Sequence, residues 1–387
     1  ITGFPWNLLG ISQVDNIPLS RIASFTGVYG LSFEILIVNA ALAAALLVRR
    51  EKRMSLLVAA IGAAIVLQAG SLVSAPEFPA DRTATLVQAN IPAIDERDWT
   101  REYFQTTLQE LTKLSEPNVS TPNPSIANPS TPDAGSAKRA GLVVWPESPA
   151  PFYEDDARFR DALSNVARRT GNWVLAGDVT VYEEGKPGQA LFNSASLVSP
   201  TGERTARYDK VHLVPFGEYV PFKNVFSFAG GLTQQVGDFS SGSSRAPLRA
   251  DGTELGIFIC YESIFPDEIR QFAKNGAQVF VNLSNDGWYG DSGAYAQHLK
   301  QSRMRAVENA RWLLLDTNTG VTASVDPYGR IVASAPRKVR TALQAEYALT
   351  TETTFYTRHG DWFAYLCAII SLAALFMRLP FLKKRKS

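Results

Sequence analysis

Three side chains of chemically reactive types each follow a predicted β-strand. Glu147 comes after the apolar run 143–145 and a proline, Lys210 lies in the segment 207–218, and Cys260 ends the apolar run 255–259. A carboxylate can take a proton, a thiolate can attack a carbonyl carbon, and a cation can stabilise the oxyanion that then forms. Placed together by a fold, these three groups would support nucleophilic acyl chemistry.

Each of these residues also has an ordinary explanation when it is taken alone. A lone buried cysteine is usually a small hydrophobic residue of the core. A glutamate after a strand is most often a solvated turn acid, and a lysine beside acidic residues is most often a surface ion-pair partner. The three residues by themselves therefore leave the chemistry open, and the elements that position them become important.

Apolar, β-branched runs alternate with amphipathic helical patterns through the middle of the chain, which predicts a layered α/β domain. The turn Asp326–Gly329 predicts a link between two late strands. Residues 115–137 hold five prolines among small polar residues and predict a flexible surface insert. The expected strands are 85–88, 141–145, 173–176, 194–198, 255–260, 278–283, 313–317 and 322–325, and the expected helices are 99–114, 157–170, 264–275 and 293–310.

The overall composition excludes several classes of protein. The 38 basic and 37 acidic residues give a net charge of +1, so the chain lacks the basic field that nucleic-acid binding requires. Cys260 and Cys367 are the only cysteines, too few for a disulfide framework, and no Cys/His spacing indicates zinc. We therefore expect no nucleic-acid partner, no metal and no cofactor.

Three apolar stretches predict transmembrane helices, at about 22–48, 54–75 and 362–377. Basic clusters at 49–53 and 378–386 follow the first and the last of these stretches, and the positive-inside rule places both clusters in the cytoplasm. The intervening chain then lies on the opposite side of the membrane. A buried core helix is the alternative interpretation of each stretch.

These patterns divide the chain into three parts. Residues 1–77 form a partial N-terminal membrane domain, 78–358 a catalytic domain outside the cytoplasm, and 359–387 a C-terminal transmembrane helix with a basic tail. The chain begins with Ile1 rather than methionine and has no signal-peptide pattern, so we expect it to be N-terminally truncated.

The order and surroundings of Glu147, Lys210 and Cys260 resemble the catalytic triad of the nitrilase, or carbon–nitrogen hydrolase, superfamily. The separations of 63 and 50 residues suit that fold, since 210 − 147 = 63 and 260 − 210 = 50. The sequence motifs that carry the resemblance are Trp145–Glu147, Lys210–Glu218 and Cys260–Glu262. Further matching segments are 282–290, His298, 303–306, 308–309 and 317–320.

With predicted membrane helices on both sides, the chain is similar to the apolipoprotein N-acyltransferases, the integral membrane members of that superfamily. The opening residues 2–6 and the block 215–218 add to this similarity. The resemblance implies a four-layer α-β-β-α sandwich flanked by transmembrane helices, in a multi-pass protein of the bacterial inner membrane with its catalytic domain on the periplasmic side. The similarity extends over nearly the whole chain and excludes only the proline-rich insert.

The resemblance also implies a reaction, the last step of lipoprotein maturation. A fatty acyl chain passes from a phospholipid, typically phosphatidylethanolamine, to a thioester on Cys260, and then to the α-amine of a diacylglyceryl-cysteine apolipoprotein. Glu147 acts as base, and Lys210 with backbone N–H groups near Tyr261 holds the oxyanion. Glu218, Tyr261 and Glu262 match further active-site residues of the family, and Trp288 and Tyr289 line either the acyl pocket or the core.

Two alternative functions remain at this stage. A membrane-tethered amidase of the nitrilase type would use the same triad with water as acceptor. A membrane scaffold would keep the fold without activity, although the presence of all three triad residues argues against it. Release of free fatty acid or ammonia would indicate the hydrolase, and a cysteine no more reactive than a model thiol would indicate the scaffold.

Overall fold

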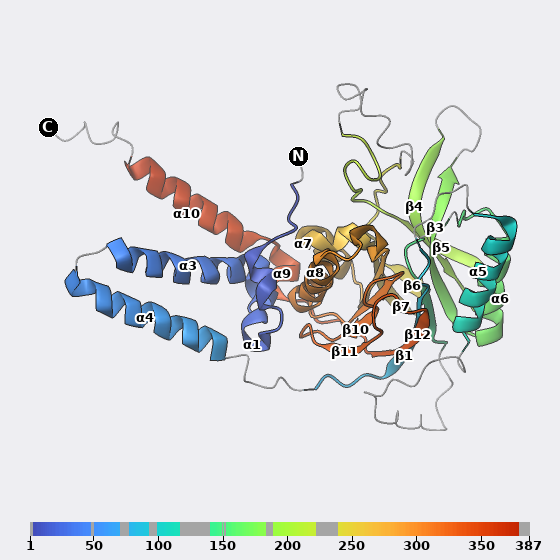
Figure 1. The fold of residues 1–387 in the computed structure, drawn as a ribbon, viewed down its shortest axis with the longest axis horizontal. Coiled ribbons are helices and arrows are strands. Elements are labelled where there is room, and N and C mark those ends of the chain that lie inside the picture. Colours follow the sequence, from blue (N-terminus) through green and yellow to red (C-terminus); the bar gives the residue numbers. More distant parts are fainter. Residues whose placement is uncertain are drawn as a thin grey trace.

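A computed structural model describes residues 3–47, 50–69, 77–92, 99–116, 140–148, 150, 152–182, 189–221 and 239–378. Three long helices project from one side of an α/β body (Figure 1). Most of the predicted insert 115–137 and the basic cluster at 383–386 lie outside the described residues. The helical segments are η1 Leu9–Gln13, α1 Ile17–Ser20, α2 Ala23–Thr26, α3 Val28–Leu47, α4 Arg50–Ala69, α5 Arg101–Leu114, α6 Ala157–Thr170, η5 Cys260–Ile264, α7 Pro266–Lys274, η6 Asp286–Tyr289, α8 Ala294–Asn309, α9 Phe355–His359 and α10 Trp362–Arg378.

Within the described residues, the strands of the body form two six-stranded sheets of mixed direction. The first sheet has the order β12-β1-β2-β3-β4-β5, and the second has the order β11-β10-β9-β8-β7-β6. In each sheet three central strands run parallel and the outer strands pair antiparallel. The strands are β1 Arg82–Gln88, β2 Leu142–Trp145, β3 Trp173–Tyr182, β4 Ala190–Val198, β5 Arg204–Asp209, β6 Leu248–Ala250, β7 Thr253–Ile259, β8 Val279–Ser284, β9 Leu313–Thr317, β10 Ala323–Val325, β11 Ile331–Ser334 and β12 Thr341–Tyr347.

The two sheets share one apolar core, which fixes the strand ends of one sheet relative to the other. Leu86 and Leu197 from the first sheet belong to the same buried cluster as Phe258 and Leu314 from the second. Their near-complete burial stabilises the packing of the two sheets, at about 25 cal/mol per Å² of apolar surface removed from water. A reactive group on one sheet can therefore be held at a fixed distance from a group on the other.

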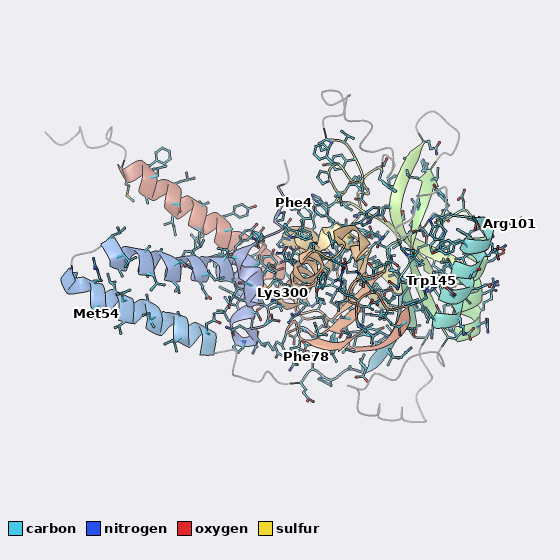
Figure 2. All side chains as sticks on the ribbon, viewed as in Figure 1. Phe4, Met54, Phe78, Arg101, Trp145 and Lys300 are labelled. Atoms are coloured by element: carbon cyan, nitrogen blue, oxygen red, sulfur yellow. The ribbon has the colours of Figure 1, made fainter. Side chains whose placement is uncertain are left out.

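Helices cover the remaining faces of the sheets. α5 and α6 pack on the first sheet through a second buried cluster that includes Phe104, Trp145 and Phe159. α7 packs on the second sheet, where Gly256 leaves room for Phe272 because a Cβ at this glycine would lie 3.1 Å from the Phe272 Cβ. Figure 2 places Trp145 inside the body and Met54 near the tip of the projecting helices, in agreement with their exposed fractions of 2% and 69%.

The projecting helices carry their apolar side chains outward. Among the described residues, α3 is the helix long and apolar enough to cross a membrane, and α10 has a shorter apolar stretch at Trp362–Met377. Leu36 on α3 is 54% exposed and Ile369 on α10 is 64% exposed. Exposed apolar surface of this extent is costly in water and is expected where lipid covers the helix.

The helices differ in detail from the predicted transmembrane stretches. The first stretch, 22–48, is not one helix, since the chain turns at Gly27 with φ = 68° and α3 begins at Val28. The Tyr356 ring packs 2.5 Å from the position of a Cβ at Gly27, so this turn has no room for a side chain. α4 includes the charged residues 50–53 at its start, and the end of the second predicted stretch lies outside the described residues.

The chain enters and leaves the body at one place. β1 pairs antiparallel with β12 from Arg82 opposite Tyr347 to Gln88 opposite Thr341. Next to the body, the Trp362 indole N–H donates to the Phe25 carbonyl oxygen at 2.9 Å, and their rings pack edge to face. These contacts connect the start of α10 to the segment before α3.

Candidate active site

The three predicted catalytic residues all follow strands, and the packed sheets bring them to one site. Glu147 comes after β2 and Lys210 directly after β5, both in the first sheet. Cys260 comes directly after β7 in the second sheet and opens the helical turn η5. All three are buried, with exposed fractions of 6% or less. The site therefore lies between the two sheets and depends on their packing.

Lys210 lies between two carboxylates. Its Nζ is 2.8 Å from Glu218 Oε1 and 3.3 Å from Glu147 Oε1. Burial opposes the charge on the ammonium group, but the Glu218 and Glu147 carboxylates raise the pKa of Lys210 above its usual range. The lysine is therefore a fixed cation and not a proton donor at physiological pH.

Asn193 completes this network and was not identified from the sequence. Its Nδ2 donates to Glu147 Oε1 at 2.9 Å and to Glu218 Oε1 at 2.8 Å. The other Glu147 oxygen accepts from the Asn285 backbone N–H at 2.8 Å. An amide in the apolar strand 190–198 was the available signal, because a buried asparagine requires hydrogen-bond partners. Each carboxylate is thus held in a defined orientation.

Cys260 has an uncommon backbone conformation for a residue with a side chain. Its φ of 47° lies in the left-handed region, and such a residue costs about 1–3 kcal/mol unless its surroundings hold it there. The Ser284 and Tyr289 side chains lie close enough to the thiol to influence its pKa or to be influenced by it. Strain of this kind at a strand end, on the candidate nucleophile, is typical of a functional site.

The resting form of Cys260 is the neutral thiol. Burial and the Glu147 carboxylate raise the pKa of this thiol well above its usual range, while Lys210 lowers it. The thiolate that attacks a carbonyl carbon must therefore be generated during the reaction. Among the carboxylates that raise this pKa, Glu147 has the largest effect, and it also contacts Lys210.

Glu218 and Glu262 hold the loops around the site. The second Glu218 oxygen accepts from the Val214 N–H at 2.7 Å, which closes the loop after Lys210. Glu262 Oε1 accepts from the Tyr208 hydroxyl at 2.7 Å and from two backbone N–H groups after Lys210, at 2.7 and 3.0 Å. Its Oε2 accepts from the Ile259 N–H at 2.6 Å. Glu262 therefore joins the nucleophile's turn to the lysine's strand.

Several aromatic side chains lie beside the candidate site residues in space or in sequence. Tyr261 is buried and its ring packs on Phe4, with centroids 5.7 Å apart. Phe4, Phe216 and Trp288 are exposed by 62%, 52% and 65%. Trp288 is therefore a surface residue and not part of the core, whereas its neighbour Tyr289 contacts the cysteine sulfur.

The histidines near the site differ in their surroundings. His212 stacks on Phe265 at a centroid distance of 3.6 Å, and its ring is 3.8 Å from the Glu268 carboxylate. His298 is fully buried and contacts the backbone of Cys260 directly. From the sequence, His298 matched a family motif but had no assigned role.

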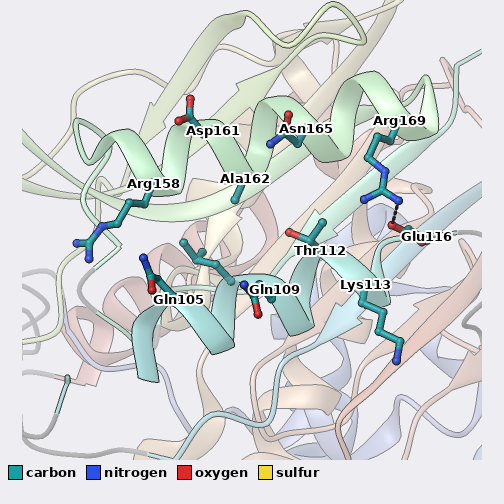
Figure 3. Close-up of a pocket in the computed structure, with 11 residues that line it drawn as sticks. Gln105, Gln109, Thr112, Lys113, Glu116, Arg158, Asp161, Ala162, Asn165 and Arg169 are labelled. Carbon is teal, nitrogen blue, oxygen red and sulfur yellow. Dashed lines mark ion pairs between the residues drawn. The ribbon is translucent and has the colours of Figure 1, made fainter. Parts of the chain in front are cut away.

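A separate pocket of about 610 Å³ lies between α5 and α6 on the far side of the first sheet (Figure 3). Most of the residues that line it are polar or charged, together with Leu108 and Ala162, and an ion pair of 2.8 Å joins Arg169 to Glu116 at one end. None of the predicted catalytic residues lines it. The candidate active site is defined by the buried network around Cys260 and not by this hollow.

Comparison with known proteins identifies the family. Residues 83–355 match the carbon–nitrogen hydrolase family, and residues 1–41 match the apolipoprotein N-acyltransferase N-terminal domain. The chain is 35% identical, over 393 residues, to the apolipoprotein N-acyltransferase of Geobacter metallireducens, covering 99% of this chain and 71% of that protein. The chain belongs to the apolipoprotein N-acyltransferase family. The family member from Methylococcus capsulatus is also 35% identical, over 100% of this chain and 71% of its own length.

Membership of this family confirms the resemblance drawn from the motifs, and the chain is an acyltransferase of the carbon–nitrogen hydrolase superfamily. Solved structures similar to this fold include the nitrilase-superfamily protein Nit3 of Saccharomyces cerevisiae. That match has a TM-score of 0.47 at 18% identity and covers 71% of this chain and 93% of Nit3.

Proposed function

We propose that this chain transfers a fatty acyl group from a phospholipid to the N-terminal amine of a lipoprotein through a thioester on Cys260. The buried network of Glu147, Lys210 and Asn193 beside a strained Cys260 is the observation that carries the proposal. Its acceptor is the α-amine of a diacylglyceryl-cysteine apolipoprotein, in keeping with the name of the relatives. Phosphatidylethanolamine is the proposed donor.

In the first half-reaction, Glu147 takes the proton from the Cys260 thiol and the thiolate attacks the ester carbonyl carbon. A C–S bond forms while the carbonyl electron pair moves to oxygen. Lys210 and the Tyr261 N–H stabilise this oxyanion. The C–O bond to the glycerol then breaks, the leaving alkoxide takes the proton from Glu147, and lysophospholipid departs.

In the second half-reaction, the lipoprotein amine attacks the thioester carbonyl. Glu147 takes a proton from the amine nitrogen, and the same donors hold the second oxyanion. The C–S bond breaks, the sulfur recovers the proton from Glu147, and an amide is released. One carboxylate thus serves both halves, and Glu218 keeps the lysine in place for each.

The surroundings of the site suit substrates that are lipids. Phe216 lies two residues before Glu218, Trp288 lies beside Tyr289, and Phe4 packs on Tyr261, so exposed aromatic rings lie next to the active-site residues. Aromatic side chains favour the membrane–water interface. α3 and α10 extend their apolar surfaces from the same side of the body as the N-terminal segment that carries Phe4 (Figure 1).

The apolar helices and the basic clusters at 49–53 and 378–386 support the proposed placement in the membrane. α3, α4 and α10 anchor a multi-pass protein in the bacterial inner membrane, with residues 78–358 as the catalytic domain on its periplasmic side. The body is a four-layer α-β-β-α sandwich, in which the paired sheets lie between α5 and α6 on one face and α7 and α8 on the other. The packing clusters described above support this arrangement.

Intact-protein mass spectrometry tests the thioester. The chain is mixed with phosphatidylethanolamine in detergent micelles without acceptor, and we expect an added acyl mass that hydroxylamine removes. Cys260→Ser should lose this hydroxylamine-labile adduct, whereas the matched variant Cys367→Ser, in α10, should keep it. A diacylated lipopeptide should then discharge the adduct as an amide.

The other outcomes separate the alternatives. An adduct that only water discharges, with free fatty acid as product, would indicate the amidase-type hydrolase. A folded protein that forms no adduct would exclude the thioester mechanism and favour the scaffold. The same adduct on Cys260→Ser and on the unchanged chain would place the acyl group elsewhere.

A further inference from the structure

A buried histidine holds the backbone of the proposed nucleophile. His298, on α8, places its Nε2 3.0 Å from the Cys260 carbonyl oxygen and its Nδ1 3.1 Å from Asp286 Oδ1. The side chain is fully buried. Its ring lies parallel to the Trp6 indole, with centroids 6.4 Å apart, and 5.9 Å from the Tyr289 ring. The imidazole therefore has one fixed position.

The two partners determine the charge of the ring. A carbonyl oxygen can only accept a hydrogen bond, and an ionised carboxylate can only accept as well. Both ring nitrogens must then carry protons, so the ring is an imidazolium paired with Asp286. Burial opposes this charge, but Asp286 and the hydrogen bonds raise the pKa of His298 above its usual range.

The hydrogen bond to the carbonyl also fixes the amide at the other end of the same peptide. A trans peptide unit is planar, so its C=O and N–H point in opposite directions. Holding the Cys260 carbonyl oxygen against His298 directs the Tyr261 N–H away from the ring. A positive charge at the carbonyl end additionally polarises that peptide and strengthens the N–H as a donor.

We propose that His298 is a positioning residue that holds the Cys260–Tyr261 peptide so that the Tyr261 N–H faces the oxyanion of the acyl-transfer reaction, with Asp286 keeping the imidazole charged. This inference rests on the proposed acyl transfer. It also accounts for the uncommon backbone conformation of Cys260, with φ = 47°, because His298 holds the carbonyl oxygen of this same residue.

α8 is suited to this role because it holds the turn η5 at a second point. Arg305, two turns after His298, donates to the Ser263 carbonyl oxygen at 3.4 Å and pairs with Glu308 at 2.8 Å. Asp286 is also fixed, because the Ser284 hydroxyl donates to its Oδ1 at 2.7 Å and Gly320 approaches its Oδ2 closely. The donor and its counter-ion are both held by rigid elements.

Comparison of two rates on the full chain tests the proposal. The acylation rate is measured by rapid mixing with phosphatidylethanolamine in detergent micelles and mass spectrometry. The alkylation rate of Cys260 is measured with iodoacetamide, a reaction that needs the sulfur but forms no oxyanion. We expect His298→Phe to slow acylation about 10- to 100-fold, less than the roughly 10²–10³-fold cost of removing an oxyanion donor outright, because the Tyr261 N–H is misdirected but still present. Alkylation should stay within about threefold.

Conservative variants test whether a donor at this position restores the acylation rate. His298→Gln keeps a neutral donor and should recover part of the acylation rate, and Asp286→Asn should fall between His298→Gln and the unchanged chain. The control His359→Gln, at an exposed position at the end of α9, should leave both rates unchanged. Melting temperatures of all variants show whether each one folds.

Several outcomes would overturn the proposal. Parallel loss of acylation and alkylation in a folded His298→Phe variant would show that the histidine merely maintains the site. Unchanged acylation would show that the peptide needs no such support. If His298→Phe does not fold, equal acylation by Asp286→Asn and the unchanged chain would overturn it instead. Absence of acylation in the unchanged chain is a different result, because it contradicts the proposed function itself.

Discussion

The network around Cys260 and the pocket between α5 and α6 contain the same kinds of charged side chain in opposite surroundings. In the network, the Lys210 and Glu147 side chains are 1% and 8% exposed. In the pocket, the Arg169 and Glu116 side chains are 62% and 33% exposed at a similar separation. The pocket has a volume of about 610 Å³, but the predicted catalytic residues lie in the network.

The difference shows that exposure to water determines how strongly a charged side chain interacts with its partner. An exposed pair is screened by solvent and contributes about 0–1 kcal/mol, so either partner can be replaced. A buried pair interacts strongly, but only a complete set of partners makes its burial tolerable. Asn193 and the Asn285 N–H complete the set for Glu147. Three variants, each compared with a matched residue of the pocket or with the unchanged chain, test this contrast.

The largest effect on activity is expected from Glu147→Gln. Loss of the general base should lower the acylation rate about 10²–10⁴-fold. The reactivity of the thiol should change in the opposite sense. The Glu147 carboxylate raises the pKa of Cys260, so its removal lowers that pKa, and the pH profile of iodoacetamide alkylation should move to lower pH.

The matched control for this variant is Glu116→Gln, which should leave both the acylation rate and the alkylation profile unchanged. An alkylation profile of Glu147→Gln that moves to higher pH would contradict the assigned electrostatics. Acylation at the normal rate would contradict the role of Glu147 as base.

Lys210→Met should affect both activity and stability. Acylation should fall about 10²–10³-fold because the oxyanion loses its cation. The Glu147 and Glu218 carboxylates would remain buried without their shared partner, and the free energy of unfolding should fall by about 3–5 kcal/mol. Urea denaturation followed by tryptophan fluorescence measures the second effect.

Lys113→Met is the control, because Lys113 is exposed in the α5–α6 pocket. Its free energy of unfolding should change by no more than about 0.5 kcal/mol. Equal destabilisation by the two lysine variants would remove the distinction between the two regions.

The smallest effect is expected from Arg169→Ala. This variant breaks the exposed ion pair with Glu116, and the free energy of unfolding should fall by about 0–1 kcal/mol. Acylation should proceed at the normal rate. A loss of acylation above about tenfold would show that the pocket takes part in the reaction after all.

Burial explains which strands the sequence could predict. Every strand assigned from an apolar run, from 85–88 to 322–325, overlaps a strand of the two sheets, although Cys260, the last residue of the strand predicted at 255–260, begins η5 instead. The edge strands β5, β6 and β12 were not assigned, and β11 was expected only as the partner across the turn Asp326–Gly329. Edge strands have one unpaired side and tolerate polar residues, as in β5, which reads Arg-Thr-Ala-Arg-Tyr-Asp.

The site residues also divide into those that the local sequence predicts and those that only tertiary packing reveals. Glu147, Lys210 and Cys260 were predicted because each ends a strand and their order matches a family motif, and the structure brings them together. Asn193 and Asp286 were not assigned, since their contacts depend on how the two sheets and η6 meet in space. Local pattern identifies reactive residues, whereas the residues that orient them depend on tertiary packing.

The pairing of β1 with β12 has a mechanical consequence. Arg82, at the start of β1, lies opposite Tyr347, at the end of β12. The chain therefore enters and leaves the body at the same end of this pair of strands. A sideways force that drew α3 away from α10 would first load the contacts of Phe25 with Trp362 and Phe355. Once these contacts had broken, tension between Arg82 and Tyr347 would act across the hydrogen bonds between β1 and β12. These bonds would then break one pair after another, starting at Arg82 and Tyr347, and not all together. The contacts of Phe25 with Phe355 and Trp362 therefore resist this force first. Their loss would lower the force needed to separate β1 from β12.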